Sequence, residues 1–356
     1  MKKTAKLMAL LLALVMALSL VACSNNGPFA DPDSGSSDPA ESKTAESNQP
    51  SQAPAESSDP ASGEKYVVGI CQLLPHTALN AATEGFKDAL KEEFGDNVEI
   101  KEGNAGGDPA NCTTIIDGYV ADGVNLILAN ATPSLTAAAS ATDTIPVLGT
   151  AVTNYGIALD LDSTEDKVLG GNISGTSDLA PLDQQAAMIQ ELFPEATNVG
   201  LLYCTAEPNS VYQIETIQGF LESMGYTCTR YGFNDVNDLA AVTQTAADNS
   251  DVIYIPTDNT AADNTSTIAD VVIPAKVPVI CGEEGICGGC GVATLSISYY
   301  EIGHIAGEMA AQILKGEKSV SEMPIGFDTT LDKKYNASIC EQLGLTMPAD
   351  YVAIEG

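Results

Sequence analysis

The chain has no tryptophan, only two histidines and few basic residues. Among its 356 residues, 15 lysines and arginines compare with 48 aspartates and glutamates, so the formal net charge at pH 7 is −33. A surface this acidic repels phosphate backbones and anionic lipid headgroups. The composition therefore argues against nucleic acid as a partner and favours a soluble, self-repelling body.

Motifs of the common enzyme classes are also missing from the sequence. There is no Gly-x-Gly-x-x-Gly after a predicted strand, no Walker A lysine motif and no Gly-x-Ser-x-Gly elbow. The two histidines, His76 and His304, limit the choice of a general base. We therefore expect a binding protein with no catalytic residues, no cofactor and no bound metal.

Residues 1–22 have the features of a bacterial lipoprotein signal peptide. Three lysines precede an almost wholly apolar run over residues 7–21, which is short for a membrane-spanning helix. The tetrapeptide Leu20-Val21-Ala22-Cys23 resembles a lipobox, with a small residue before the cysteine. We expect cleavage before Cys23 and lipidation of that cysteine, which would anchor the chain through acyl groups.

Residues 23–64 begin with this cysteine and continue as a linker. The segment is rich in serine, proline and acidic residues and has almost no large apolar side chain. It cannot bury enough apolar surface to offset the entropy of ordering. We expect a disordered spacer between the lipid anchor and the folded body.

Eight cysteines remain after Cys23, and only Cys281, Cys287 and Cys290 are close together in sequence. An even number of cysteines in an exported chain is compatible with disulfides. However, Cys71 falls at the end of a predicted strand, where cysteine packs as a small apolar residue. Free thiols, a local disulfide such as Cys287–Cys290 and a metal site at the cluster all stay open from the sequence.

Alternating strand and helix patterns begin near Tyr66. Short apolar runs predict strands, and apolar residues at helical spacing predict helices between them. Asp108 and Pro109 suit the N-cap and first position of one of these helices. The predicted strands lie at 67–71, 98–100, 126–129 and 146–150, and the helices between them at 78–94, from Asp108 to about Asp122, and in the alanine-rich segment after 134. This βαβαβαβ order indicates a parallel sheet covered by helices.

The pattern occurs a second time. Val199-Gly200-Leu201-Leu202 matches Val68-Gly69-Ile70-Cys71, and later features match in the same order. The Val-Gly pair and the following Ile/Val-Pro pair are 77 positions apart in the first copy and 78 in the second. The period is too long for a solenoid. We infer a duplicated α/β lobe.

Polar residues follow corresponding strands in the two copies. The predicted strand Val252–Ile255 leads to Thr257, Asp258 and Asn259, and its counterpart in the first copy leads to residues 130–134. Ligands of open α/β sheets bind at the carboxyl ends of the strands. The sequence therefore predicts a small-molecule site between the two lobes.

Eight short segments between about Tyr66 and Tyr351 stand out by their order and spacing: 76–80, 104–109, 131–133, 175–178, 207–210, 256–259, 282–285 and 298–303. Together they resemble the tryptophan/tyrosine-type family of ABC-transporter substrate-binding lipoproteins. His76 is followed by threonine where the family has proline, and Asn80 stands in place of an aspartate.

The resemblance implies an α/β fold with two similar Rossmann-like lobes, whose parallel sheets are joined by a three-strand hinge (the type I periplasmic-binding-protein fold). Residues 65–175 and about 296–322 would form the N-terminal lobe. Residues 176–295 and about 323–356 would form the C-terminal lobe. The predicted helix Tyr299–Leu314 would return to the N-terminal lobe.

An amino-acid ligand would need donors for its carboxylate and acids for its ammonium group. Hydroxyl and amide groups at strand–helix turns suit the carboxylate, although Ser210 could serve only as a helix cap. We favour Asp258 for the ammonium group, with Asn259 beside it. Tyr155, Tyr212 and Tyr299 are candidates for an aromatic slot or for packing. The expected ligand-binding residues are Gln72, His76, Ala131, Thr132, Ser177, Asp178, Asn209, Ser210, Thr257, Asp258, Asn259 and Glu284.

The function implied by the resemblance is that of the solute-binding component of an ABC importer. The solute would be a small molecule, an aromatic or other amino acid first of all, and the lobes would close on it and deliver it to a permease with its ATPase. The protein would be a monomer, lipid-anchored at the extracellular face of the cell membrane. A ligand-sensing lipoprotein with a signalling partner, or a binding protein for a nucleoside or a branched-chain amino acid, stays open as an alternative.

Overall fold

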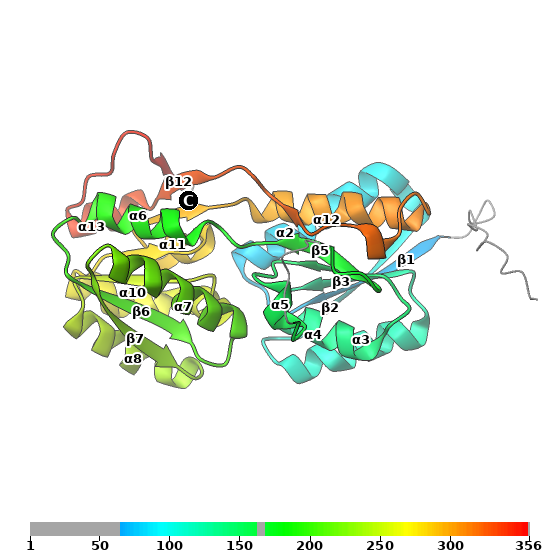
Figure 1. Cartoon of the computed structure of the whole chain (residues 1–356), viewed down its shortest axis with the longest axis horizontal. Coiled ribbons are helices and arrows are strands. Elements are labelled where there is room, and N and C mark those ends of the chain that lie inside the picture. The colour runs from blue at the N-terminus through cyan, green and yellow to red at the C-terminus, as the bar shows by residue number, and fades with distance from the viewer. Residues whose placement is uncertain (1–64, 162–167, 355–356) are drawn as a thin grey trace, which may run out of the picture. The chain divides into compact units, whose positions relative to one another are not determined.

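The computed structural model describes residues 65–161 and 168–354 (Figure 1). The predicted signal peptide, the lipidation site Cys23 and the linker up to residue 64 lie outside these ranges. Among the described residues, no helix combines the length and the apolar character that a membrane crossing requires.

The first lobe contains a six-stranded sheet in the order β11-β5-β4-β3-β1-β2 (Figure 1). All of its neighbouring strands pair in parallel. The strands are β1 (Tyr66–Gln72), β2 (Val98–Asn104), β3 (Leu126–Asn130), β4 (Val147–Thr150), β5 (Ile173–Ser177) and β11 (Gly326–Phe327). The helices are α2 (Thr77–Phe94), α3 (Pro109–Asp122), α4 (Thr132–Ala141), α5 (Tyr155–Ala158) and α12 (Tyr299–Leu314), with 3₁₀ turns at Gly95–Asn97 and Val320–Glu322.

The second lobe contains a seven-stranded sheet in the order β13-β12-β10-β9-β8-β6-β7. It is parallel except for the antiparallel pairing of β10 with β12. The strands are β6 (Asn198–Cys204), β7 (Thr227–Phe233), β8 (Val252–Ile255), β9 (Val279–Cys281), β10 (Ala293–Ser296), β12 (Asp332–Tyr335) and β13 (Val352–Ala353). The helices are α6 (Leu182–Leu192), α7 (Pro208–Ser223), α8 (Val236–Asn249), α9 (Asn259–Asp263), α10 (Thr265–Ala275), α11 (Glu284–Cys290) and α13 (Ala337–Leu343).

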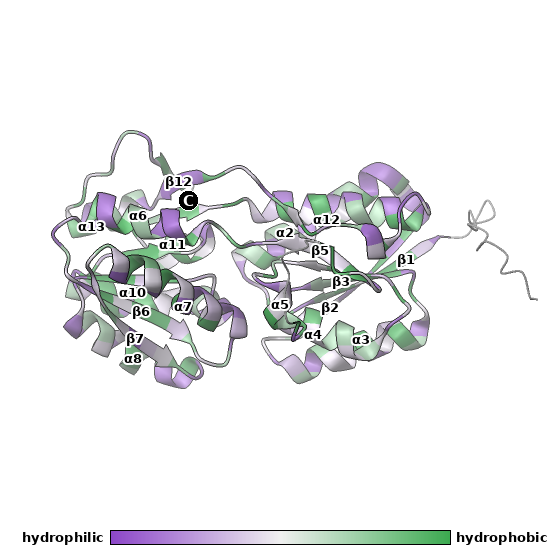
Figure 2. Ribbon diagram, viewed as in Figure 1, coloured by the Kyte–Doolittle hydropathy of each residue, from purple (hydrophilic) through white to green (hydrophobic). Residues whose placement is uncertain are grey.

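The strand orders confirm the duplication. The first sheet contains β2-β1-β3-β4, and the second contains the equivalent β7-β6-β8-β9. The predicted cap of α3 is also present, because the Asp108 side chain accepts a hydrogen bond from the backbone N–H of Ala110 at 2.9 Å. Apolar strand residues of both lobes are buried, and Figure 2 shows helices that carry hydrophobic and hydrophilic residues on different sides.

The chain passes between the sheets three times, after Ser177, after Ser296 and after Phe327. The sequence predicts that the two first-lobe segments end at residue 175 and at about residue 322. In the structure both segments of the first lobe continue further along the chain. β5 ends at Ser177, and β11 pairs with β5 so that Gly326 lies opposite Thr176 and Phe327 lies opposite Ser177. A strand of two residues has no periodicity that could reveal it in the sequence.

Helix α12 packs closely against α2 of the first lobe. Glycines permit this approach at both helices. A Cβ atom on Gly303 would lie 2.0 Å from the carbonyl oxygen of Ala82, and one on Gly85 would lie 2.1 Å from that of Tyr300. The chain therefore leaves β10, enters α12 at Tyr299 and brings this tyrosine to the same edge as the ends of β1 and β5.

Candidate functional site

Loops from both lobes surround a small cavity at the carboxyl ends of the strands. It holds only about 10 Å³ of free volume, which is roughly the space of one water molecule. Any larger solute therefore requires the walls of this cavity to separate. The lining residues are His76, Leu79, Ala151, Asp178, Asn209, Thr257, Asp258, Asn259, Ala262, Glu283 and Tyr299.

The cavity brings together half of the residues predicted for the ligand site. These six are His76, Asp178, Asn209, Thr257, Asp258 and Asn259. The other six lie behind the lining or to one side of it, and the structure shows what each of them contacts. They are Gln72, Ala131, Thr132, Ser177, Ser210 and Glu284.

Gln72, at the end of β1, uses its whole amide group within the first lobe. Its Nε2 donates to the Leu74 carbonyl at 2.9 Å and to Asn80 Oδ1 at 2.7 Å. Its Oε1 accepts from the Thr83 hydroxyl at 2.6 Å. Gln72 therefore holds the β1–α2 loop, which carries His76, in place.

The turn into α4 is also built from predicted residues. Ala131 has a φ of 89°, a left-handed conformation that is strained for a residue with a Cβ atom. Its N–H donates to the Thr150 carbonyl at 3.0 Å. Thr132 follows as the first residue of α4 and is 4% exposed. The strained turn positions the start of this helix at the ligand-binding edge of the sheet.

Asp258, which the sequence favours as the ammonium partner, is fully engaged with backbone groups. Its Oδ1 accepts from the N–H of Ala261 at 2.9 Å, which caps α9, and its Oδ2 accepts from the N–H of Cys204 at 2.6 Å. Burial and the charge of Glu207 raise the pKa of Asp258 to about 8. Ser210 Oγ is a further partner of this carboxyl group. Asp258 thus has a structural role that leaves it little capacity for a ligand.

Glu207 was not predicted, although it organises the second-lobe side of the cavity. Its carboxylate accepts from the N–H and Nδ2 of Asn259 at 2.9 and 2.8 Å. It also accepts from the N–H and hydroxyl of Thr260 at 2.8 and 2.7 Å. Its sequence signals were its place before Pro208, at the N-cap of α7, and its membership of the segment 207–210 that carries the family resemblance.

Glu283 lines the cavity, whereas the predicted residue was its neighbour Glu284. The Glu283 carboxylate caps α11 by accepting from the N–H groups of Gly285 and Ile286, both at 2.5 Å. Burial raises its pKa to about 7. The Glu284 side chain does not line the cavity and forms an ion pair with Lys334 at 2.6 Å. An N-cap residue points its side chain back over the helix start, and the next residue points away.

Asp178 follows β5 at the first crossing between the lobes. Its Oδ2 accepts a hydrogen bond from the Tyr299 hydroxyl at 2.9 Å, and its Oδ1 makes no hydrogen bond. The residue is 4% exposed, and burial raises the pKa of its carboxyl group, while the nearby Thr153 and Tyr299 side chains act in the opposite direction. A buried carboxylate oxygen without a donor is costly, so this atom suits a donor supplied by a ligand.

Three unpartnered polar atoms converge on the cavity. Among the described residues, seven buried side-chain polar atoms lack a hydrogen-bond partner, and the cavity-lining residues supply three: His76 Nδ1, Asp178 Oδ1 and Asn209 Oδ1. Asn209 Nδ2 donates to the Thr257 carbonyl at 3.0 Å and to Glu207 Oε2 at 3.3 Å, and both partners only accept. The free atom of Asn209 is therefore its carbonyl oxygen, an acceptor.

The hydrogen-bond network also sets the state of His76. Its Nε2 lies 3.3 Å from Asn259 Oδ1. Because Asn259 Nδ2 donates to Glu207, Oδ1 is the accepting atom, and Nε2 must carry the hydrogen. Burial lowers the pKa of His76, so the ring is neutral near pH 7 and Nδ1 is an acceptor. All three unpartnered atoms of the cavity are then acceptors.

The charge of the cavity agrees with this pattern. Four buried carboxyl groups, those of Asp178, Glu207, Asp258 and Glu283, lie at or directly behind the lining. No lysine or arginine is among the lining residues. A primary ammonium group offers three N–H donors and a positive charge, which is the chemistry that three acceptors in an acidic cavity can hold.

A second, larger cavity of about 320 Å³ adjoins this site, and Asn259 lines both. Its walls include apolar groups from loops of both lobes, with Glu207 and Asn259 on one side. Leu73, Leu74, Pro109, Pro133 and Ala206 supply the apolar surface. This outer cavity offers space for an apolar or aromatic group attached to an ammonium group in the inner one.

Two of the three aromatic candidates lie elsewhere. Tyr155 and Tyr212 line a separate cavity of about 210 Å³, together with Ser177, whose hydroxyl donates to the Thr153 carbonyl at 3.1 Å. Thr153 Oγ1 lies 3.4 Å from Thr257 Oγ1, a contact between the two lobes at the edge of the inner cavity. Tyr299 is the one candidate that lines the inner cavity.

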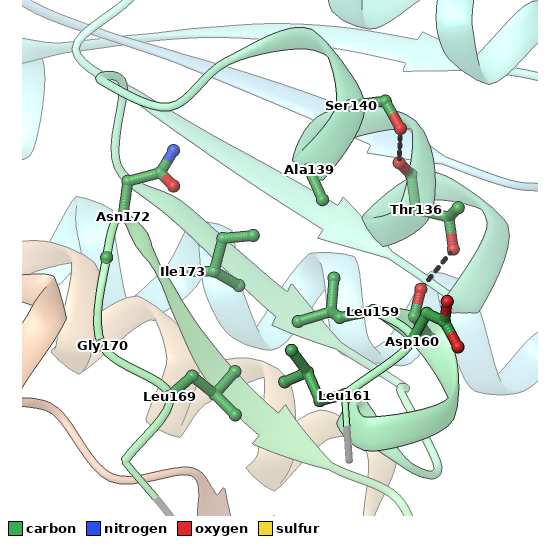
Figure 3. Close-up of a pocket in the computed structure, with 12 residues that line it drawn as sticks. Thr136, Ala139, Ser140, Leu159, Asp160, Leu161, Leu169, Gly170, Asn172 and Ile173 are labelled. Atoms are coloured by element: carbon green, nitrogen blue, oxygen red, sulfur yellow. Dashed lines mark hydrogen bonds between the residues drawn. The ribbon is translucent and has the colours of Figure 1, made fainter. Parts of the chain in front are cut away.

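A cavity of about 530 Å³ lies in the first lobe near the amino end of β5 (Figure 3). Leu159, Leu169 and Ile173 line it, and the hydroxyls of Thr136 and Ser140 on α4 are hydrogen-bonded to carbonyl groups, as Figure 3 shows. None of its lining residues has an unpartnered buried polar atom. It lies away from the carboxyl ends of the strands, so we assign it no ligand.

The cysteines of the described residues are all free thiols, and seven of these eight are buried. This includes Cys281, Cys287 and Cys290, for which the sequence left a disulfide and a metal site open. The two helical members lie on α11, which begins beside Glu283. Within residues 65–161 and 168–354, no group of three or more metal-binding side chains is arranged to hold an ion.

Comparison with known proteins identifies relatives over the folded body. Residues 67–354 match the family model described as ABC transporter substrate binding protein. A tyrosine-binding protein of Clostridioides difficile (strain R20291) is 32% identical over 337 residues, which cover 94% of this chain and 90% of the relative.

Solved structures show the same relationship. A complex with L-Trp from Streptococcus pneumonia is 30% identical, with a TM-score of 0.76 over 80% of this chain and 97% of that one. A ligand-free, open substrate-binding protein with adhesive properties from Clostridium difficile is 32% identical, with a TM-score of 0.64 over 82% of this chain and 99% of that one. A leucine-binding protein from Thermotoga maritima, 14% identical with a TM-score of 0.53, shares the fold. The architecture is that of the type I periplasmic binding proteins.

Proposed function

Because the chain belongs to the ABC transporter substrate-binding protein family, we propose that its solute is an α-amino acid with an aromatic side chain. The relatives named for tyrosine and crystallised with L-Trp support an aromatic amino acid. The physical support comes from the inner cavity, where three unpartnered acceptors match the three N–H groups of a primary ammonium.

In this proposal, Asp178 takes the place of Asp258 as the charged partner of the ammonium group. Asp178 has a free oxygen, whereas both oxygens of Asp258 are occupied. Asn209 and the neutral His76 supply the other two acceptors. Glu283, whose pKa is about 7, adds partial negative charge at the same wall near neutral pH.

The carboxylate of the ligand must be held without a basic side chain, because no lysine or arginine lines either the inner or the outer cavity. Backbone N–H groups at a helix start and hydroxyl groups serve an anion instead. We assign this role to the start of α4 at Thr132, which offers an N–H and a hydroxyl group and lies next to Pro133 of the outer cavity. The aromatic ring would occupy the outer cavity against Leu73 and Leu74.

The mechanism is a change in the separation of the lobes. The inner cavity is too small for an amino acid, so the solute enters when the lobes part. A ligand that contacts His76 on the first lobe and Asn209 on the second favours the arrangement in which both contacts form. That arrangement would then engage the permease, and the binding protein itself carries out no reaction.

The proposal also covers the location, the membrane anchor and the partner of the protein. The family places such proteins outside the cytoplasmic membrane and pairs them with an ABC transporter. We propose that Cys23 carries the lipid anchor, that the mature chain is a monomer at the extracellular face, and that a permease with its ATPase is the partner.

Binding can be measured directly because the chain has no tryptophan. Indole emission from a mixture of protein and L-tryptophan then reports the ligand alone. Titration calorimetry with aromatic, branched-chain and nucleoside solutes, and mass spectrometry of any solute released by heating, would rank the candidates. The proposal predicts that an aromatic amino acid binds most tightly. Preference for a solute without an amino group would contradict it.

A further inference from the structure

Two buried thiols of the first lobe meet at one hydroxyl group. Cys71 lies near the carboxyl end of β1, Cys112 lies in α3, and both are fully buried. Their Sγ atoms lie 3.7 and 3.5 Å from the same Ser134 Oγ, in the first turn of α4. Two sulfur atoms 41 positions apart in sequence thus share one small buried space.

The Cys71 thiol also lies 3.9 Å from the backbone carbonyl oxygen of Cys112, to which it can donate, so the two residues are in direct contact. The neighbouring Cys71 and Ser134 side chains lower the pKa of Cys112 to about 7. The neighbouring Cys112 and burial raise the pKa of Cys71. One sulfur is therefore favoured as a thiolate nucleophile, with a second thiol in contact to complete an exchange.

We propose that Cys71 and Cys112 are a disulfide-forming pair, a modification site that ties β1 to α3 beside the ligand-binding loops. These loops are already joined by hydrogen bonds. The N–H of Ala105 donates to the Gln72 carbonyl at 2.9 Å, and that of Gly107 donates to the Leu73 carbonyl at 2.8 Å. A covalent link directly behind them would stiffen the wall that carries Leu73 and Leu74.

The oxidant is a low-molecular-weight disulfide, which reaches the buried thiols during folding or local opening of the lobe, and the exchange proceeds in two steps. The Cys112 thiolate attacks one sulfur of the reagent and expels one reagent thiolate. The Cys71 sulfur, after losing its proton, attacks the Cys112 sulfur and expels the second. One reagent S–S bond breaks and one protein S–S bond forms. The two reagent thiols carry away the two electrons and the two protons.

The other buried cysteines offer a competing site. Cys281 lies close to Cys287 and Cys290, but burial raises its pKa, which disfavours the thiolate. The Cys71–Cys112 pair brings two thiols to one hydroxyl group, and the pKa of Cys112 is lowered to about 7. The first-lobe pair should therefore oxidise first.

The test incubates the mature protein with reduced and oxidised glutathione in two preparations. In one the protein is native, and in the other it refolds from the reduced, denatured state. Free thiols are then blocked with N-ethylmaleimide in denaturant, and the digest is mapped by mass spectrometry. We expect a peptide pair linked through Cys71 and Cys112. We expect oxidation to raise Tm by roughly 5–15 °C, because the link closes a loop of about 40 residues. Amide hydrogen exchange at residues 72–74 and 105–112 should slow.

Cys112→Ser should abolish the linked peptide and the Tm shift. Cys228→Ser, which changes a half-buried cysteine of β7, should leave both intact. Complete alkylation of Cys71 and Cys112 in both preparations would overturn the proposal, and so would a disulfide within the Cys281 cluster while Cys71 and Cys112 stay reduced. The peptide map of the unaltered protein decides the matter even if Cys112→Ser does not fold. The outcome is independent of which solute binds.

Discussion

Asp178→Asn separates the binding role of this carboxylate from its effect on stability. The substitution keeps the size and shape of the side chain, and the Tyr299 hydroxyl can still donate to the amide oxygen. It removes the negative charge and the free acceptor oxygen that face the cavity. Loss of a charge-assisted hydrogen bond to a buried ammonium costs about 2–3 kcal/mol. That corresponds to a roughly 30- to 150-fold weaker Kd for an aromatic amino acid.

The same substitution should not destabilise the ligand-free protein. Burial raises the pKa of Asp178 above its ordinary value of 3.8. A carboxyl group with a raised folded-state pKa stabilises the fold below its ordinary pKa, and this contribution is lost as the pH rises. At pH 7 the neutral asparagine should therefore leave Tm unchanged or raise it, while affinity falls.

Calorimetric titration and thermal unfolding on the same preparations measure both quantities. Asp183→Asn, at an exposed aspartate in the first turn of α6, is the matched control and should alter neither Kd nor Tm. Unchanged affinity in Asp178→Asn would remove this residue from the ammonium site. A parallel fall in affinity and Tm would indicate a structural role instead.

Three further predictions concern the other acids of the site. Glu207→Gln should lower the free energy of unfolding by about 2–4 kcal/mol, because four donors of Asn259 and Thr260 depend on the Glu207 carboxylate. Urea denaturation measures this free energy, and a loss below about 0.5 kcal/mol would contradict the prediction. Glu283→Gln should weaken ligand binding severalfold while Glu284→Gln does not, and equal effects in a binding titration would refute the assignment of the cavity wall. Folded-state pKa values of about 8 for Asp258 and about 7 for Glu283 lie above the ordinary 3.8 and 4.5. The stability of the ligand-free protein should therefore fall between about pH 4 and pH 8, and a rise over this range would disagree with the buried acids described.

Much of the fold could be predicted from the sequence because its signals are local and repeated. The strand Val252–Ile255 and the helix Tyr299–Leu314 were predicted with the bounds that the structure has. The strand is a short continuous apolar run that occurs in both copies of the duplication, and the helix has apolar residues at helical spacing. β11 escaped prediction because it has only two residues, Gly326 and Phe327, which are too few to show a period.

The site was less predictable than the fold. The edge of the sheet and six of the lining residues followed from strand ends, which is a topological rule. The choice among neighbouring acids did not follow. Whether Glu283 or Glu284 faces the cavity depends on which one caps α11, and whether Asp258 is free depends on the distant N–H of Cys204. Glu207 acts through Asn259 and Thr260, some 50 positions away, and no linear pattern reports such a contact.

The central claim, that the inner cavity holds an ammonium group, can be tested by one comparison of ligands. Titration calorimetry would compare L-tyrosine or L-tryptophan with the same molecule lacking its α-amino group, which keeps the ring and the carboxylate. The deaminated analogue should bind at least about 100-fold more weakly, since it leaves His76, Asp178 and Asn209 without donors. Equal affinity for the two molecules would contradict it.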